Sequence, residues 1–503
     1  MTTVNARAGR REWTALAVLM LPLLLVSMDV SVLYFAVPAI SADLAPGATQ
    51  QLWILDVYGF VLAGLLITMG SLGDRIGRRR LLLAGAAVFG AASLAAAHAQ
   101  GPGQLIAARA LLGVGGAALM PSTLALIRNL FRDDAQRAKA VTAWTAVMAS
   151  GISLGPVVSG ALLEHFWWGS VFLLNLPAMA LLLVLGPLLL PESRSAAGGR
   201  FDALGSVLSL AALLPVIHGV KELARGGWRP LPAAGIAAGL VLGALFVARQ
   251  RRAEHPMVDL ALLRTRAYGG AVLANLMAMF ATVGFAVFLT QYLQSVLGQS
   301  PFEAALWSVV PSVGVMAAAP GAAALATRVD RAYVIGGGFG FSVLGFAALM
   351  WLRTDSPLWF VLAAATVYAS GLVAAMTLAN ELALGAAPPE RAGSAAAVLE
   401  SGTELGGALG MAVLGSVGAA VYGRDMAPVA SGAARETLGG ALGTGDAGVA
   451  ALAREAFTHG LNWGAGGAAV SMGVAAGCAV LMLRGASAGR APSPRVGAAH
   501  GAG

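Results

Sequence analysis

The sequence predicts an all-α membrane protein in which fourteen transmembrane helices cross the bilayer. Of its 503 residues, 58% are hydrophobic and only 11% are charged, whereas about a quarter of the residues of a soluble domain are charged. The apolar residues fall in blocks of roughly 18–28, a length that crosses ~30 Å of hydrocarbon as a helix. Lys and Arg gather between alternate blocks, as they do in cytoplasmic loops.

Charged, Gly-rich or Pro-containing segments bound each apolar block. The first block is too long for a cleavable signal peptide and predicts the first span. The seventh and eighth blocks contain Pro215, His218 and Gly243, so one re-entrant hairpin is the alternative to two full spans. The predicted spans are 14–36, 51–72, 81–99, 104–127, 140–163, 168–190, 203–220, 231–249, 269–297, 304–326, 333–352, 357–380, 393–421 and 460–484.

The distribution of basic residues predicts the orientation. With the N-terminus inside, 24 of the 32 Lys and Arg residues lie in cytoplasmic segments, and Arg109 lies within a span. Such an asymmetry favours both termini in the cytoplasm, in a multi-pass protein of the inner membrane. The seven outer residues are Lys221, Arg225, Arg229, Arg353, Arg424, Arg435 and Arg454.

Several other classes of function find no support in the sequence. The net charge of +8 comes from short loop clusters and not from a basic patch with aromatics, so we expect no nucleic-acid partner. The six histidines lack metal-ligand spacing, and no phosphate-binding loop with a Lys-Ser/Thr ending is present. A membrane-embedded transferase or protease would need a set of catalytic His, Ser or Cys residues at a membrane boundary, and the sequence contains no such set. We therefore expect no enzyme activity, metal or cofactor.

A short loop rich in Gly, Asp and Arg joins the second and third spans. Its glycines allow a tight turn, and Asp74 can meet a helix N-terminus or an Arg across an interface. A basic loop that only orients the chain is the alternative, but it requires neither Asp74 nor the glycines. The pattern resembles the signature loop of the major facilitator superfamily, which implies a gating role. The motif residues are Gly70, Gly73, Asp74, Arg75, Gly77 and Arg78.

The fifth span carries Gly151, Gly155, Pro156 and Gly160. Pro156 removes a backbone hydrogen bond and the glycines allow close helix packing. The pattern resembles the antiporter motif of proton-driven exporters of the same superfamily, with Ser159 in place of a glycine. A general small-residue packing face is the alternative.

Charged residues at lipid depth are costly and need a partner or a function. Arg109 lies in the fourth span, and its alternative is to snorkel to the outer interface. The acids are Asp29 in the first span, Asp56 in the second, and Glu400 and Glu404 in the thirteenth. The last two are spaced i, i+4 and share one helix face, where two carboxylates cannot both ionise cheaply. A structural hydrogen-bond role is the alternative for each acid.

The segments around these acids, and residues 163–177, resemble the fourteen-helix drug:proton antiporter branch of the superfamily, which exports quaternary ammonium compounds and other drugs. The resemblance implies two six-helix bundles with two inserted helices, and it implies that Asp29, Asp56, Glu400, Glu404 and Arg109 form the proton-coupling and cation-binding sites. Tyr34 departs from the usual Asn of the family, and the tenth span lacks the acid of some relatives. The expected domains are an N-terminal six-helix bundle (1–195), a segment with the two inserted helices and a linker (196–262), a C-terminal six-helix bundle (263–486) and a disordered tail (487–503).

Aromatic and Met side chains near the acids would complete a cation site, because aromatic faces attract quaternary ammonium groups. Ordinary packing is the alternative. The outer loop 424–459 is either a lid or a solvated connector. The candidates are Trp53, Tyr58, Trp144, Met148, Phe280, Tyr292 and Trp307.

The sequence thus favours a monomeric, proton-driven exporter of lipophilic cationic drugs, with substrate, protons and the lipid bilayer as its partners. Two alternatives stay open: export of an endogenous metabolite or antibiotic, and passive transport of a neutral metabolite. Intramembrane carboxylates argue against passive transport.

Overall fold

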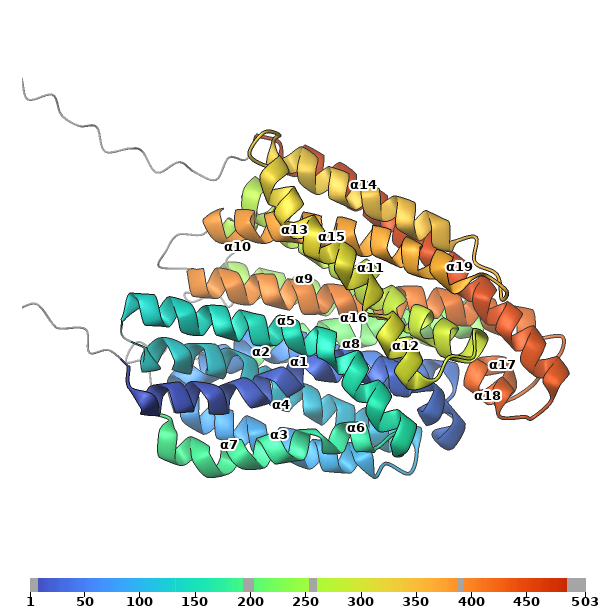
Figure 1. Cartoon of the computed structure of the whole chain (residues 1–503), viewed down its shortest axis with the longest axis horizontal. Coiled ribbons are helices and arrows are strands. Elements are labelled where there is room, and N and C mark those ends of the chain that lie inside the picture. The colour runs from blue at the N-terminus through green and yellow to red at the C-terminus, as the bar shows by residue number, and fades with distance from the viewer. Residues whose placement is uncertain (1–7, 132, 193–202, 253–259, 387–391, 486–503) are drawn as a thin grey trace, which may run out of the picture.

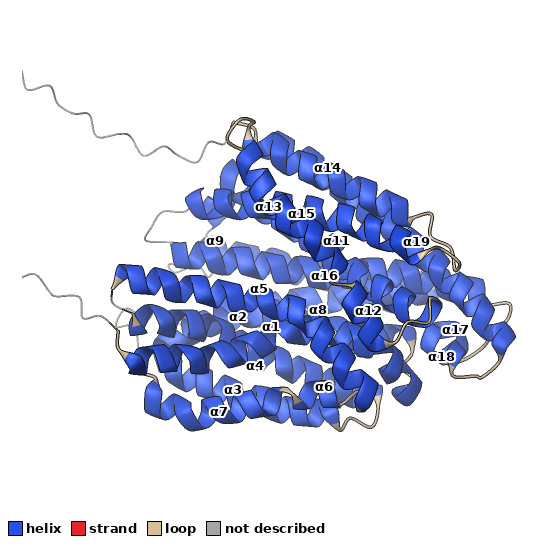
Figure 2. Ribbon diagram, viewed as in Figure 1, coloured by secondary structure: helices blue, strands red, loops and turns tan. Residues whose placement is uncertain are grey.

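The structure, a computed structural model, describes residues 8–131, 133–192, 203–252, 260–386 and 392–485. Within these ranges the chain is built from helices and contains no strand (Figure 2). In lipid, every backbone N–H and C=O needs an internal partner, and a helix supplies one for nearly all of them. The all-α class predicted from the sequence is confirmed.

The first bundle is formed by the N-terminal part of the chain, from α1 to α7 (Figure 1). In it α1 packs against α5 and α7, α2 packs against α4, and α3 packs against α4 and α7. Its helices are α1 (Arg10–Leu44), α2 (Ala48–Ile76), α3 (Arg78–Ala97), α4 (Pro102–Leu130), α5 (Asp134–His165), α6 (Ser170–Leu173) and α7 (Asn175–Leu189).

The second bundle is centred on α11, which contacts α15, α16 and α19. A π-helical turn, Tyr292–Val296, follows α11. Contacts between α2 and α16, α5 and α12, and α1 and α11 join the two bundles. Its helices are α10 (Leu260–Leu263), α11 (Arg266–Gln291), α12 (Pro301–Trp307), α13 (Val310–Leu325), α14 (Arg331–Leu349), α15 (Leu358–Ala386), α16 (Ala392–Met426), α17 (Ala433–Glu436), α18 (Leu438–Leu442) and α19 (Ala447–Leu483).

Two helices lie between the bundles in sequence, α8 (Ala203–Gly226) and α9 (Pro230–Arg252), and they pack against each other. They contain 24 and 23 residues, or about 35 Å each at 1.5 Å per residue. That length favours two full spans over a re-entrant hairpin. Helix α8 also contacts both α2 and α16, so it lies where the two bundles meet.

Twelve helical stretches among the described residues have the length and apolar composition of a membrane span. The two other predicted spans correspond to α5 and α8, which are long enough to cross a bilayer. The count of fourteen stays a prediction. The predicted boundary at 195/196 and the tail 487–503 lie outside the described residues, and the boundary at 262/263 falls within α10.

Small residues let the helices approach closely. A Cβ atom on Gly85 of α3 would lie 2.8 Å from the Ala118 Cβ atom of α4 and 3.1 Å from the Gly115 carbonyl oxygen, so the two backbones nearly touch. The outer faces of the bundles carry exposed apolar side chains, as contact with lipid requires. Examples are Val184, Leu188, Val313, Leu344, Val470 and Leu481.

Helix α1 begins and α19 ends at the same end of the molecule, opposite α17 and α18 (Figure 1). An even number of crossings requires this arrangement. One residue of the predicted charge pattern was misplaced: Lys221, assigned to an outer loop, lies inside α8 with its side chain fully buried. Without Lys221, six basic residues lie in outer segments and 24 lie in cytoplasmic segments, so the predicted orientation is unchanged.

Reporter fusions test this topology. Fusions after Arg200 and after Arg266 should report the cytoplasm, and a fusion after Arg229, between α8 and α9, should report the periplasm. A cytoplasmic signal at Arg229 would show that α8 and α9 do not cross the membrane. A periplasmic signal at Arg266 would contradict their paired insertion.

Candidate functional site

A buried ion pair connects α4 with α1. Arg109 of α4 pairs with Asp29 of α1, and the exposed fractions of their side chains are 1% and 4%. The Arg109 Nε atom donates a hydrogen bond to the Ile54 carbonyl (3.2 Å), and the guanidinium lies 4.8 Å from the centre of the Tyr58 ring. Arg109 therefore faces protein on every side. The snorkelling alternative is wrong.

A second buried ion pair connects α8 with α2. The Lys221 Nζ atom donates to the Asp56 Oδ1 atom at 2.8 Å and lies 2.7 Å from Oδ2, with both side chains at most 1% exposed. The same ammonium lies 4.0 Å from the centre of the Trp53 ring. The sequence analysis did not predict Lys221 as a site residue. A signal was present, because Lys221 follows Leu214 and Ile217 at helical spacing on the face of α8 that packs against α2 and α16.

The two carboxylates of α16 differ from the other two acids. Glu400 and Glu404 are half-buried, and no described residue forms an ion pair or a hydrogen bond with either of them. The charge of Glu400 acts on Glu404, as the i, i+4 spacing predicts. Asp29 and Asp56 thus each have a cation, whereas this pair of carboxylates has none within the described structure.

Tyr34 of α1 is buried close to charged groups of three other helices. Its buried hydroxyl lies within electrostatic reach of Arg109, Asp56 and Glu404. It occupies the position at which the sequence departs from the family pattern. The charges of the two ion pairs and of Glu404 act on Tyr34, on Tyr58 or on one another. The two ion pairs, Glu404 and Tyr34, contributed by α1, α2, α4, α8 and α16, are hereafter called the charged layer.

The predicted aromatic residues divide into two groups. Trp53 and Tyr58 lie against the cations of the charged layer. Trp144 instead donates to the Thr123 hydroxyl of α4 (3.1 Å), and Tyr292 donates to the Arg353 carbonyl (2.5 Å). Phe280 lies on α11, where its carbonyl faces Gly410 of α16.

The loop motif forms a tight turn. Gly77 is both the C-cap of α2 and the N-cap of α3. Its φ of 110° is a conformation that favours glycine. Asp74 pairs at 2.6 Å with Arg78, the first residue of α3. Of the two predicted partners, a helix N-terminus or an Arg across an interface, the structure thus has Asp74 beside the start of a helix of its own bundle. Gly73 also packs on Arg78, and Gly70 faces Pro121 of α4. Arg75 is exposed.

The glycines of the antiporter motif face two neighbours. Gly151 and Gly155 of α5 face the α1 backbone, near the Leu24 and Met28 carbonyls, and Pro156 lies inside the helix between them and Gly160. Gly160 faces the second bundle: a Cβ atom there would lie 2.8 Å from the Pro301 carbonyl oxygen and 2.9 Å from the Phe302 Cα atom. Gly160 therefore allows the bundles to touch.

Gly160→Val should destabilise the protein by about 1–3 kcal/mol, because the added methyl groups force α5 away from α12. Gly321→Val is the matched control, since a Cβ atom at Gly321 meets no atom within 4 Å. The shift in the melting temperature of the purified protein is the measurement. Equal melting temperatures in the two variants would contradict a role for this contact.

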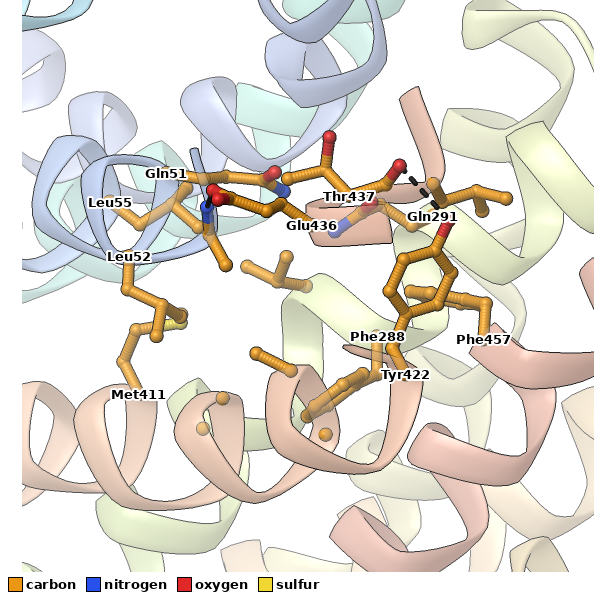
Figure 3. A pocket seen from close by; sticks show the side chains of 17 residues that line it. Gln51, Leu52, Leu55, Phe288, Gln291, Met411, Tyr422, Glu436, Thr437 and Phe457 are labelled. Carbon is orange, nitrogen blue, oxygen red and sulfur yellow. Dashed lines mark hydrogen bonds between the residues drawn. The ribbon is translucent and has the colours of Figure 1, made fainter. Parts of the chain in front are cut away.

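A cavity lies between the bundles near α17 and α18 (Figure 3). Gln51, Leu52 and Leu55 of α2 form one side, and Phe288 and Gln291 of α11 with Met411 and Tyr422 of α16 form the other (Figure 3).

The outer loop closes over this cavity. Glu436 accepts a hydrogen bond from the Ala48 N–H at the start of α2 (3.2 Å), and the Tyr422 hydroxyl donates to the carbonyls of Ala434 (2.9 Å) and Thr437 (3.0 Å). Residues 433–442 thus bind both bundles, unlike a solvated connector.

Comparisons with known proteins agree with this arrangement. Residues 19–411 match the model of the Major Facilitator Superfamily. The chain is 44% identical over 446 residues to the multidrug efflux pump LfrA of Mycolicibacterium smegmatis, with 88% of each chain covered. It is 34% identical over 411 residues to the methyl viologen resistance protein SmvA of Salmonella typhimurium, covering 80% of this chain and 82% of that one.

The fold also matches a solved transporter. The crystal structure of a bacterial homologue of the human lysosomal transporter Spinster aligns with a TM-score of 0.66 and 17% identity, over 95% of this chain and 98% of that chain. At this identity the match concerns the fold alone. Together with the family match over most of the sequence, it shows that the chain belongs to the major facilitator superfamily, as a relative of its drug-efflux transporters.

Proposed function

We propose that the protein is a proton-coupled antiporter that exports lipophilic cations, such as quaternary ammonium compounds and dyes, across the inner membrane. One observation carries the proposal: Glu400 and Glu404 lie half-buried at lipid depth with no described cation beside them. Two such carboxylates attract either protons or an organic cation. The names of LfrA and SmvA, which refer to multidrug efflux and to methyl viologen, support the same substrate class.

The exchange follows from charge balance. Protons that enter from the outside neutralise the α16 carboxylates and release the cation, and loss of these protons to the cytoplasm restores the negative site. Tyr34 and Tyr58 lie within electrostatic reach of Glu404, so their hydroxyl dipoles respond to its charge. The proton gradient drives the cycle and no cofactor takes part.

The energy is sufficient for uphill export. If two protons enter for each monovalent cation expelled, one net charge moves inward. The membrane potential then contributes ~2.3 kcal/mol per 100 mV, in addition to ~1.4 kcal/mol per proton for each pH unit.

The buried ion pairs and the motifs have supporting roles in this cycle. Asp29 binds Arg109 and can exchange this partner for a proton, which couples α1 to α4. The contact of Gly160 with α12 joins the two bundles and changes as they rock, and the loop of Asp74 gates this movement, as the motif resemblance implies. The protein acts as a monomer with both termini in the cytoplasm.

A growth-inhibition panel tests the proposal. Cells with and without the protein are exposed to ethidium, a quaternary ammonium biocide, and an acidic drug. The protein should raise the inhibitory concentration of the two cations and leave that of the acidic drug unchanged. Equal protection against the acidic drug, or protection against neither cation, would contradict export of cations.

A further inference from the structure

The second ion pair of the charged layer has the chemistry of a site for an organic cation. Such a cation is recognised by a carboxylate and by the face of an aromatic ring. The Asp56 carboxylate and the Trp53 ring supply both, and the group between them is the Lys221 ammonium, 2.8 Å from Oδ1 and 4.0 Å from the ring centre. We call the Asp56 carboxylate and the Trp53 ring the Asp56 cage.

The occupant of the cage is unusual for this chain. Of its 32 basic residues only Lys139 and Lys221 are lysines, and Lys139 is exposed. An ammonium is a compact charge on a flexible stem, whereas an Arg guanidinium would hold both carboxylate oxygens in a planar, bidentate pair. The buried position thus carries the cation that resembles a substrate amine more closely and leaves its carboxylate more readily.

The helix that delivers this lysine lies where the bundles meet. Ile217 of α8 is buried together with Phe60 of α2 and with Ala408 and Ala412 of α16. When the bundles rock, α8 cannot keep its contacts with both helices unchanged. The distance between Lys221 and Asp56 is therefore a quantity that the transport cycle can alter.

The other charged and titratable groups of this region are Arg109, Glu404, Tyr34 and His218. Arg109 acts electrostatically on Asp56, and both Asp56 and Glu404 act on Tyr34. The His218 ring lies 6.2 Å from the Trp53 ring, one turn before Lys221. A cation that reached the charged layer would therefore find Asp56 already neutralised by the protein itself.

We propose that Lys221 is a built-in competitor of the substrate: its ammonium group and the cationic group of the exported compound exchange with each other in the Asp56 cage. The inference rests on the proposed export of lipophilic cations. Because one positive charge replaces another, the exchange leaves the net charge at Asp56 unchanged. Lys221 thereby sets how tightly the charged layer holds a cation, while the exchange of protons and cation on Glu400 and Glu404 drives its release.

Equilibrium binding of ethidium to the purified full-length protein in lipid nanodiscs tests this, at one pH and with no gradient. Lys221→Met should bind ethidium more tightly, on the order of tenfold, because the competitor is gone. Lys221→Arg should bind ethidium several-fold more weakly, because the bidentate pair holds Asp56 more firmly. The double variant Asp56→Asn with Lys221→Met should lose the gain. Lys139→Met should match the wild type.

If Lys221 has only a structural role, the two single variants should bind ethidium differently from this expectation. Lys221→Met would then bind ethidium as the wild type does or more weakly, and Lys221→Arg would leave affinity unchanged, and either result overturns the inference. Gel filtration and the melting temperature check the fold. If Lys221→Met does not fold, Lys221→Arg decides by itself. Absence of ethidium binding to the wild-type protein would instead contradict the proposed function, which keeps the two failures distinct.

Discussion

Replacing both carboxylates of α16, in the variant Glu400→Gln with Glu404→Gln, should lower the export of ethidium by about two orders of magnitude, because the carboxylates on which protons and the cation exchange are gone. In the structure Glu404 acts on Tyr34 and Tyr58, so we expect Glu404→Gln to be as severe as Glu400→Gln. Efflux from preloaded cells is the measurement.

Glu381→Gln is the matched control for these variants. Glu381 lies on the neighbouring helix α15, its side chain is 50% exposed, and its ion-pair partner Arg331 is 3.8 Å away. Exposed pairs of this kind contribute little, so efflux should stay at the wild-type rate. Wild-type efflux in the double Gln variant would show that the α16 carboxylates are structural.

Breaking the Asp29–Arg109 pair should have the largest effect on stability. Either Asp29→Asn or Arg109→Gln leaves one buried charge without its partner, which costs about 3–5 kcal/mol. The melting temperature of the purified protein should fall sharply in both single variants. Loss of transport in a single variant therefore does not by itself identify a coupling residue.

The neutral pair Asp29→Asn with Arg109→Gln separates the two roles. With both charges removed, most of the lost stability should return, because no uncompensated charge is left in the interior. Export should stay at the background level if Asp29 exchanges Arg109 for a proton during the cycle. A stable double variant that exports ethidium at the wild-type rate would show that the pair only holds α1 against α4.

Most of the architecture could be predicted from the sequence, because lipid leaves little choice of backbone structure. Apolar blocks of sufficient length must become helices, and the predicted spans correspond to helices of the structure. Several ends were wrong, because polar residues continue a helix beyond the membrane. Helix α19 begins at Ala447, 13 residues before the predicted span, and α8 continues past Lys221.

The partners in the charged layer were harder to predict. The sequence shows that Asp29, Asp56 and Arg109 are at lipid depth, yet it cannot show which acid meets which cation, because that depends on the packing of helices distant in sequence. Asp56 lies 165 residues from Lys221. Lys221 was overlooked since it follows an apolar block closely, where a loop cation is the more common case. The outer loop is similar: only the fold places Glu436 at the start of α2.

Transport in liposomes tests the central claim, which is that protons and a lipophilic cation exchange on the carboxylates of α16. Purified protein is reconstituted, a pH gradient is imposed, and ethidium and an internal pH dye are followed together. Ethidium should accumulate only in the presence of the gradient, ethidium addition should speed the decay of the gradient, and the double Gln variant should do neither. Ethidium movement at the same rate with and without a gradient, and with no proton flux, would contradict proton-coupled export.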